Sequence, residues 1–195
     1  MNFLAHFHLA GPEQGLLAGA LEGDFRKGRL RGELPSDIER GVALHRAIDA
    51  YTDTHPLMTE LRGHFPTSLR RYAGILIDLS FDHFLSRHWH QFNDLPLESF
   101  IREVHTALAA QQQHLSDRAE QMRCAMLQHD ILARYGEWAA VPASAARVGE
   151  RFRRGNPLLH VEAELEPVRQ SLEQAFLSFY PQLQSWAEFT RQRLD

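Results

Sequence analysis

The chain has almost no cysteine, and this excludes two kinds of structure. Cys124 is the only cysteine in 195 residues, so no internal disulfide can form and a cysteine-based zinc site is excluded. A single unpaired thiol fits a reducing compartment. Cys124 has no evident activating neighbour in the sequence, and we expect a packed thiol rather than a nucleophile.

Long apolar runs are also missing. No stretch approaches the roughly 18 uninterrupted apolar residues that a membrane span requires. The opening segment, MNFLAHFHLAGPEQG, lacks a basic start, and His6 and His8 interrupt its apolar run, so it does not resemble a signal peptide. We therefore expect a soluble, cytoplasmic protein with no membrane partner.

The chain lacks an excess of positive charge. Its formal net charge is -4, whereas a nucleic-acid-binding domain is normally basic, so no nucleic-acid partner is expected. It also lacks a P-loop, a GxGxxG fingerprint and a GxSxG nucleophile elbow. Hydrophobic residues at 44% and charged residues at 24% are ordinary globular values, and the length suits a single domain over residues 1–195. The oligomeric state is left open.

Helical periodicity fills most of the chain, and no convincing strand pattern occurs. The nearest strand candidate is the alternation from Phe3 to Leu9, which is short and rich in helix formers. The predicted fold class is all-α, a single-domain helical bundle. The expected helices cover residues 16–27, 36–52, a short piece from 56, 70–92, 95–114, 117–135, 140–154 and 158–193, the last bent near Pro167 and broken at Pro181.

The predicted helix from Ser36 carries polar residues on its inward face. Ser36 is expected as its N-cap, with Glu39 three residues later as the capping-box partner. A stripe in steps of three and four residues begins apolar and turns polar without leaving one face: Ile38, Val42, His45, Asp49 and Thr52. The i,i+4 pair of His45 and Asp49 is either a satisfied core pair or a pair of metal ligands.

The segment ILIDLSFDHFL is apolar on nearly every side, which is typical of a buried helix. Asp78 and Asp82 lie on one face of it, and two such carboxylates repel unless a proton or a cation lies between them. His83 follows at about 100° around the helix and can join a site if the helix borders a cleft. These oxygen and nitrogen donors suit Mn²⁺ or Mg²⁺, while imidazole keeps Zn²⁺ and Fe²⁺ open.

Other polar positions admit two interpretations. Asp24 is either a solvated acid at a helix end or a third ligand-bearing element. His6 and His8 form an HxH pair that would face one way on a strand but diverge by roughly 200° on a helix. They are either partly buried structural histidines or ligands.

Basic residues cluster despite the negative total. One run, at positions 26, 27, 29 and 31, follows Asp24 directly; two others lie at positions 70–71 and 147–154. A charged run is ordinarily a solvated face. The first run adjoins a candidate ligand, so its cations could grip a phosphate or steer an acidic partner.

Four blocks of this sequence resemble, in order and spacing, the acyl carrier protein phosphodiesterases: MNFLAHFHLA, GLLAGALEGDFRKG, GVALHRAIDAYTDTHP and RRYAGILIDLSFDHFLSRHW. The likeness is dense in the first half, and the second half matches in helical character. It implies an HD-phosphohydrolase-like helical fold that uses Mn²⁺, with Mg²⁺ or another divalent cation as substitutes. The implied reaction is hydrolysis of the phosphodiester joining 4′-phosphopantetheine to a serine of holo-acyl carrier protein, which yields apo-acyl carrier protein.

The resemblance also implies roles for residues. The metal candidates that it carries over are Asp24, His45, Asp49, Asp78, Asp82 and His83, with His6 and His8 as further candidates. The residues expected to act in catalysis, through a metal-activated water and a proton donor, are Asp24, His45, Asp78 and His83. The expected substrate contacts are Arg26, Lys27 and Arg29. The order Asp82-His83 reverses the His-Asp pair of typical HD enzymes, so their ligand assignment does not transfer.

Two other functions stay open on the sequence. One is a metal-dependent phosphohydrolase acting on a nucleotide or another small phosphoester. The other is a non-catalytic module that binds acyl carrier protein and contains a structural metal, whose removal would unfold the domain.

Overall fold

The computed structural model describes residues 1–194 and confirms the all-α fold. No strand occurs within this range, and no helix in it is long and apolar enough to cross a membrane. The α-helices are α1 Phe3–Ala10, α2 Gln14–Glu22, α3 Ser36–Thr54, α4 Pro56–His64, α5 Ala73–Arg87, α6 Leu97–Ala110, α7 Asp117–Gln128, α8 Ile131–Arg134, α9 Ala140–Gly149, α10 Glu162–Leu165 and α11 Arg169–Arg191.

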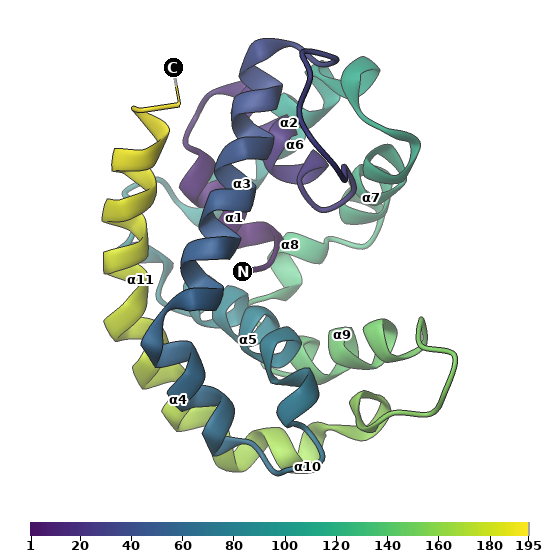
Figure 1. Ribbon diagram of the computed structural model, residues 1–195, viewed down its shortest axis with the longest axis vertical. Helices are drawn as coiled ribbons and strands as arrows, with labels where there is room; N and C mark the ends of the chain where they lie inside the picture. Colours follow the sequence, from purple (N-terminus) through teal and green to yellow (C-terminus); the bar gives the residue numbers. More distant parts are fainter. Residues whose placement is uncertain (195) are drawn as a thin grey trace.

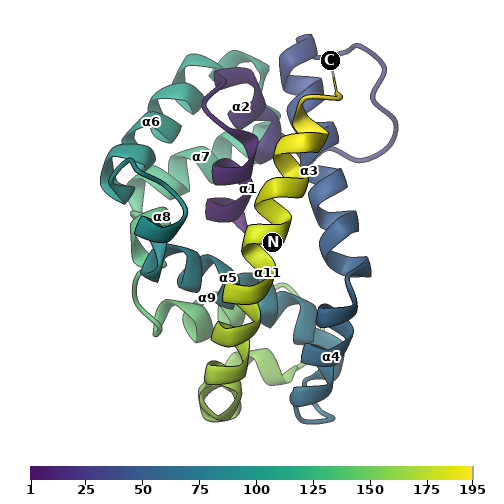
Figure 2. The same cartoon turned by 90° about the vertical axis from the view of Figure 1, so that its left-hand side faces the viewer.

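Helix α5 crosses the middle of the molecule, as its apolar sequence requires. Helices α1, α9 and α11 pack against it, and α11 runs along one edge beside α3 and α4 (Figures 1 and 2). The contact between α5 and α11 is aromatic: the rings of Phe81 and Phe176 lie 5.5 Å apart, edge to face. Burying each such side chain stabilises the fold by about 1.5–3 kcal/mol.

Two glycines let α2 and α3 approach backbone to backbone. A Cβ atom on Gly19 would lie 2.3 Å from the carbonyl oxygen of Ile38, and one on Gly41 would lie 2.6 Å from that of Leu16. Only glycine fits at such a contact, because backbone atoms cannot move aside as a flexible side chain can. The close approach places the middle of α3, where His45 lies, directly against the end of α2.

Several predicted helix boundaries are wrong. Ser36 is the first residue of α3 rather than its cap, and no side chain caps this helix. The carboxylate of Glu39 instead accepts a hydrogen bond from the backbone N–H of Glu33, at 3.0 Å. The helix expected over 117–135 is divided because Asp130 adopts a left-handed conformation with φ 47°.

The prediction for the last helix is also wrong, both at its start and at Pro181. The helix begins only at Arg169, after short helical pieces, and it continues through Pro181 without a break. Proline removes one hydrogen bond of the helix. Pro181 lies on the exposed face, while Tyr180 and Leu183 beside it are fully buried in the core. Packing on the buried face therefore holds the helix together where local sequence alone predicts a stop.

Candidate metal and active site

The first turn of α1 is fixed by a carboxylate from α5. Asp82 is completely buried, and its oxygens accept hydrogen bonds from the backbone N–H groups of Leu4, at 2.8 Å, and Ala5, at 3.1 Å. These N–H groups have no partner within the helix, and a negative group at a helix N-terminus is favourable. Burial raises the pKa of the Asp82 carboxyl to about 7, against the opposing effect of the two N–H donors. The next residue, His6, is thereby held facing α3.

The ring of His45 is oriented by the end of α2. Its Nδ1 lies 2.8 Å from the carbonyl oxygen of Ala20. A carbonyl only accepts hydrogen bonds, so Nδ1 carries the proton and the neutral ring keeps its lone pair on Nε2. Gly23 makes room for this ring, because a Cβ atom there would lie 2.3 Å from Cγ of His45.

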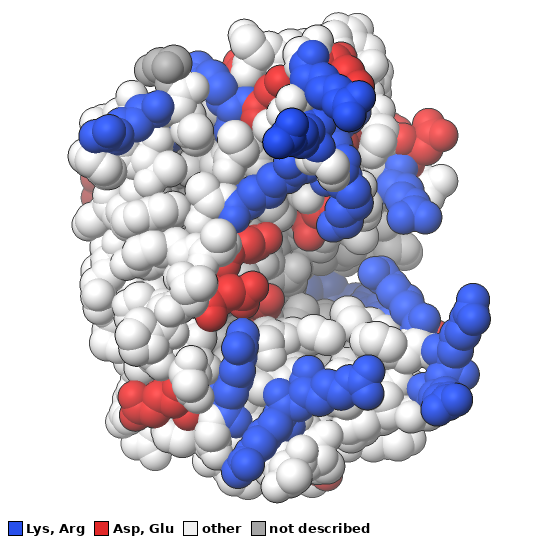
Figure 3. Space-filling model, viewed as in Figure 1, with Lys and Arg blue, Asp and Glu red and all other residues white. Residues whose placement is uncertain are grey.

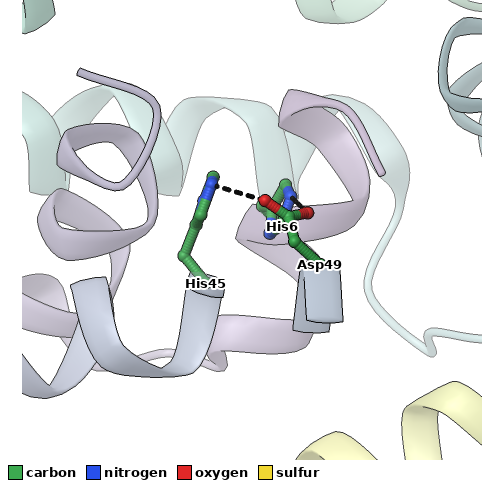
Figure 4. A group of neighbouring side chains, drawn as sticks. All are labelled: His6, His45 and Asp49. Carbon is green, nitrogen blue, oxygen red and sulfur yellow. Dashed lines mark ion pairs between the residues drawn. The ribbon is translucent and has the colours of Figure 1, made fainter. Parts of the chain in front are cut away.

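His6, His45 and Asp49 meet in one compact group (Figure 4). Asp49 Oδ1 lies 3.1 Å from His6 Nε2, and Asp49 Oδ2 lies 3.2 Å from His45 Nε2. The two imidazole rings stack with their centroids 3.8 Å apart. Both histidines are buried, whereas the Asp49 side chain is 43% exposed. The group therefore opens to solvent on the carboxylate side.

The electrostatics of the group favour a neutral His6 and an ionised Asp49. Burial lowers the pKa of His6 to about 3, and neighbouring His45 adds to the decrease. Burial alone would raise the pKa of Asp49, but the adjacent rings of His45 and His6 outweigh it and hold that pKa well below its usual range. Neutral imidazole and ionised carboxylate are the forms that bind metals.

The residues present fit a divalent cation. One ligand atom from each of His6, His45 and Asp49 lies within 4.8 Å of the other two. His6 is 2% exposed, yet neither of its ring nitrogens makes a well-directed hydrogen bond to the described residues. A buried polar atom without such a partner is unfavourable, and a cation bound between these three donors would supply one.

Two further predicted residues lie at the margin of this group. Asp78 is half-buried, and its Oδ1 accepts a hydrogen bond of 2.9 Å from the Met1 ammonium, which lies 3.7 Å from Asp49 Oδ1. Burial raises the pKa of Asp78, and the ammonium opposes that rise. Asp24 lies close enough to interact electrostatically with His45 and Asp49; desolvation by the surrounding protein raises its pKa.

The remaining two predicted ligands face other parts of the protein. Both oxygens of Asp82 are engaged by α1, as described above. His83 donates from Nδ1 to the carbonyl oxygen of Tyr135, at 2.7 Å, and its ring meets Trp138 edge to face. The structure therefore does not bring either side chain into the group with His45 and Asp49, and their roles as ligands stay predictions.

The predicted substrate contacts lie in the loop between α2 and α3. Arg46, the neighbour of His45, holds this loop by donating hydrogen bonds to the carbonyl oxygens of Arg26, at 2.9 Å, and Gly28, at 2.8 Å. The guanidinium of Arg26 is already paired with Glu22 and Glu33. Lys27 and Arg29 are exposed and form no ion pair with the described residues.

Helical spacing in the sequence did not indicate that His6 lies beside His45 and Asp49. His6 has no ligand-type partner three or four residues away, since both of its partners lie on α3. The divergence expected of His6 and His8 on a helix is confirmed. His8 points to the opposite side of α1, between the Tyr180 hydroxyl at 2.8 Å and the Phe92 carbonyl oxygen at 3.2 Å.

The fold and the site together define an all-α protein with a candidate divalent-metal centre built from two histidines and a carboxylate. The family described as "Acyl carrier protein phosphodiesterase" matches residues 1–183. The chain belongs to this family and is accordingly a hydrolase of the phosphodiesterase class.

Full-length relatives agree with that assignment. Proteins named acyl carrier protein phosphodiesterase are 33% identical over 189 residues in Yersinia pestis and 34% identical over 188 residues in Salmonella agona. The alignments cover 96% of this chain in both cases, and 98% and 97% of the relatives. The search of solved structures found no match.

Proposed function

We propose that this protein hydrolyses the phosphodiester that joins 4′-phosphopantetheine to a serine of holo-acyl carrier protein, using a divalent cation bound by His6, His45 and Asp49. The observation that carries the proposal is this group of three donors, buried on the histidine side and open on the carboxylate side. The relatives bear the name of the activity, and full-length similarity supports its transfer to this chain.

Each residue has a defined task in this proposal. The two histidines present lone pairs on nitrogens whose orientation is fixed by α1 and by the Ala20 carbonyl. Asp49 supplies the anionic oxygen between them. A bound cation would stabilise negative charge on the phosphate oxygens and make a water molecule more acidic. Oxygen and imidazole donors without thiolate suit Mn²⁺, which we propose as the cation, with Mg²⁺ as the nearest substitute.

Asp24 and Asp78 are proposed to serve the same site from its open side. Both carboxyls interact electrostatically with Asp49, and both have raised pKa values caused by desolvation. Their proposed role is to orient a water molecule or to complete the oxygen ligands around the cation. Lys27 and Arg29 follow Asp24 directly in the chain and are proposed to contact the anionic substrate.

The test is incubation of the protein with holo-acyl carrier protein and Mn²⁺, followed by intact-mass measurement of the carrier protein. We expect loss of the phosphopantetheine mass, and no loss after removal of the cation by a chelator. Asp49→Asn is expected to lower turnover by at least about 100-fold and to weaken Mn²⁺ binding measured by calorimetry, because the anionic donor is lost.

The matched control is Asp53→Asn, one helical turn further along α3. Asp53 is exposed and, among the described residues, forms its one ion pair with Arg62, at 3.4 Å, so turnover and Mn²⁺ affinity should stay near the wild-type values. If the wild-type protein cleaves a small phosphodiester but not the holo-carrier protein, the proposed substrate is wrong. A fully active Asp49→Asn would contradict the proposed site.

A further inference from the structure

Two basic segments that are far apart in the sequence meet on the surface of the protein. The first is the 3₁₀ turn Arg70–Tyr72, just before α5, and the second is residues 151–154, just after α9. The rings of Tyr72 and Phe152 lie 5.8 Å apart, edge to face, and join the segments. We call the five cations around this contact the lower lip: Arg70, Arg71, Arg151, Arg153 and Arg154.

The arginines of the lower lip are exposed and have no acidic partner among the described residues. None of the five forms an ion pair with any residue from 1 to 194, whereas other arginines of this range do. Arg26 pairs with Glu22 and Glu33, and Arg62 pairs with Asp53. Unpaired like charges held close together repel one another, so this arrangement favours an anionic partner from outside the chain.

Figure 3 shows Lys and Arg side chains around a hollow of the surface. The α2–α3 loop, with Lys27, Arg29 and Arg31, lies above the hollow, and the segments of the lower lip lie below it (Figures 1 and 3). A phosphodiester carries a single negative charge. The cations on the two sides exceed what one such group needs, so the surplus faces a larger anionic surface.

We infer that the lower lip docks an acidic protein surface, that of the carrier protein whose phosphodiester enters the hollow; this inference rests on the proposed function. The chain has a net charge of -4, and its N-terminus, whose ammonium pairs with Asp49 and Asp78, lies beside the hollow (Figures 1 and 3). That balance disfavours a polyphosphate such as nucleic acid, which places negative charge everywhere along its length. Phe152, 45% exposed among the arginines, adds an apolar contact at the centre of the docking surface.

The experiment reverses charge at the lower lip in the full-length protein with Mn²⁺. We expect Arg151→Glu/Arg153→Glu and, separately, Arg70→Glu/Arg71→Glu to raise KM for holo-acyl carrier protein at least tenfold, with kcat changed less than threefold. The ratio of mutant to wild-type KM should shrink as NaCl is increased, because salt screens exposed charges. Arg102→Glu/Arg193→Glu is the matched control: it changes the net charge equally at exposed positions outside the lower lip and the α2–α3 loop, and it should leave KM within twofold.

The outcomes separate this inference from the proposed function. A wild-type protein that does not release phosphopantetheine contradicts the proposed function itself. A wild-type protein that does so, while the lower-lip variants keep a normal KM, overturns only the docking surface. Equal losses on the carrier protein and on bis(p-nitrophenyl) phosphate would place these arginines at the metal site, which also overturns it. If the wild-type protein binds short duplex DNA more tightly than apo-carrier protein, the proposed docking surface is also overturned.

The variants can be checked for folding by circular dichroism. If a double reversal does not fold, Arg151→Ala/Arg153→Ala makes half the change in charge. It is then expected to raise KM about threefold, with the same dependence on salt. A normal KM in this variant would likewise overturn the docking surface.

Discussion

The molecule contains two polar groups of nearly identical composition, one on α3 and one on α5, and they differ in what their donor atoms contact. On α3, His45 and Asp49 direct Nε2 and both carboxylate oxygens toward each other and toward His6. On α5, Asp82 gives both oxygens to the backbone of α1, and His83 gives its Nδ1 proton to the Tyr135 carbonyl.

The difference teaches that residue type and helical spacing do not distinguish a ligand from a structural anchor. A backbone N–H group in the first turn of a helix has no partner within that helix, so it competes with a cation for a carboxylate. Asp82 of α5 holds α1 in place, and α1 supplies His6 to the α3 group. The two regions therefore act in series, one positioning the other.

The largest effect is expected when the hydrogen bonds between Asp82 and the first turn of α1 are removed. Asp82→Ala leaves the N–H groups of Leu4 and Ala5 buried without an acceptor and should lower the free energy of unfolding by about 3 kcal/mol. Urea denaturation measures the change. Asp49→Ala, at a side chain 43% exposed, should lower it by less than about 1 kcal/mol. Equal losses in the two variants would mean that the anchor and the site are not distinct.

His8, on the opposite side of α1 from His6, is expected to make the stability of the protein depend on pH. Burial lowers the pKa of His8 from 6.5 to about 4, against the opposing effect of the Phe92 carbonyl oxygen. The unfolded state therefore binds this proton first as the pH falls. The contribution of His8 to the free energy of unfolding is complete above pH 6.5 and decreases as the pH falls from 6.5 to 4. At pH 5 the free energy of unfolding is lower by about 2 kcal/mol for this reason.

Unfolding in urea at several pH values measures this effect. His8→Gln removes the titrating group, so its stability should vary by about 2 kcal/mol less than that of the wild type between pH 7 and pH 5. An unchanged pH dependence in His8→Gln would show that the His8 ring is already charged in the folded protein.

The smallest expected effect comes from a substitution that disturbs the geometry of the α3 group without removing any donor. Gly23→Ala places a Cβ atom on the His45 ring and should displace it, so the Kd for Mn²⁺ measured by calorimetry should rise about tenfold. Gly63→Ala is the matched control, since nothing lies within 4 Å of a Cβ atom there. An unaltered Kd in Gly23→Ala would mean that His45 does not need its observed orientation.

Local patterns were sufficient for much of the fold. Periodicity placed the buried helix around Asp78 and Asp82, and Pro56 opened α4 as expected. The prediction from local sequence was wrong at Pro181, where burial on the opposite face of α11 maintains the helix. It was also wrong at Asp130, where one left-handed residue divides a helix. In both places tertiary packing or a single backbone conformation overrode the average preference of the segment.

The sequence by itself determined the all-α class, the candidate pair on α3 and the family, because helical spacing and motif order are properties of short segments. Only the tertiary structure decided that His6 lies against this candidate pair, that Asp82 anchors α1, and that the two segments of the lower lip share one surface. The physical reason is that a donor atom can be assigned only when its partners are known. Here those partners come from helices and turns distant in the chain, brought together by packing around α5.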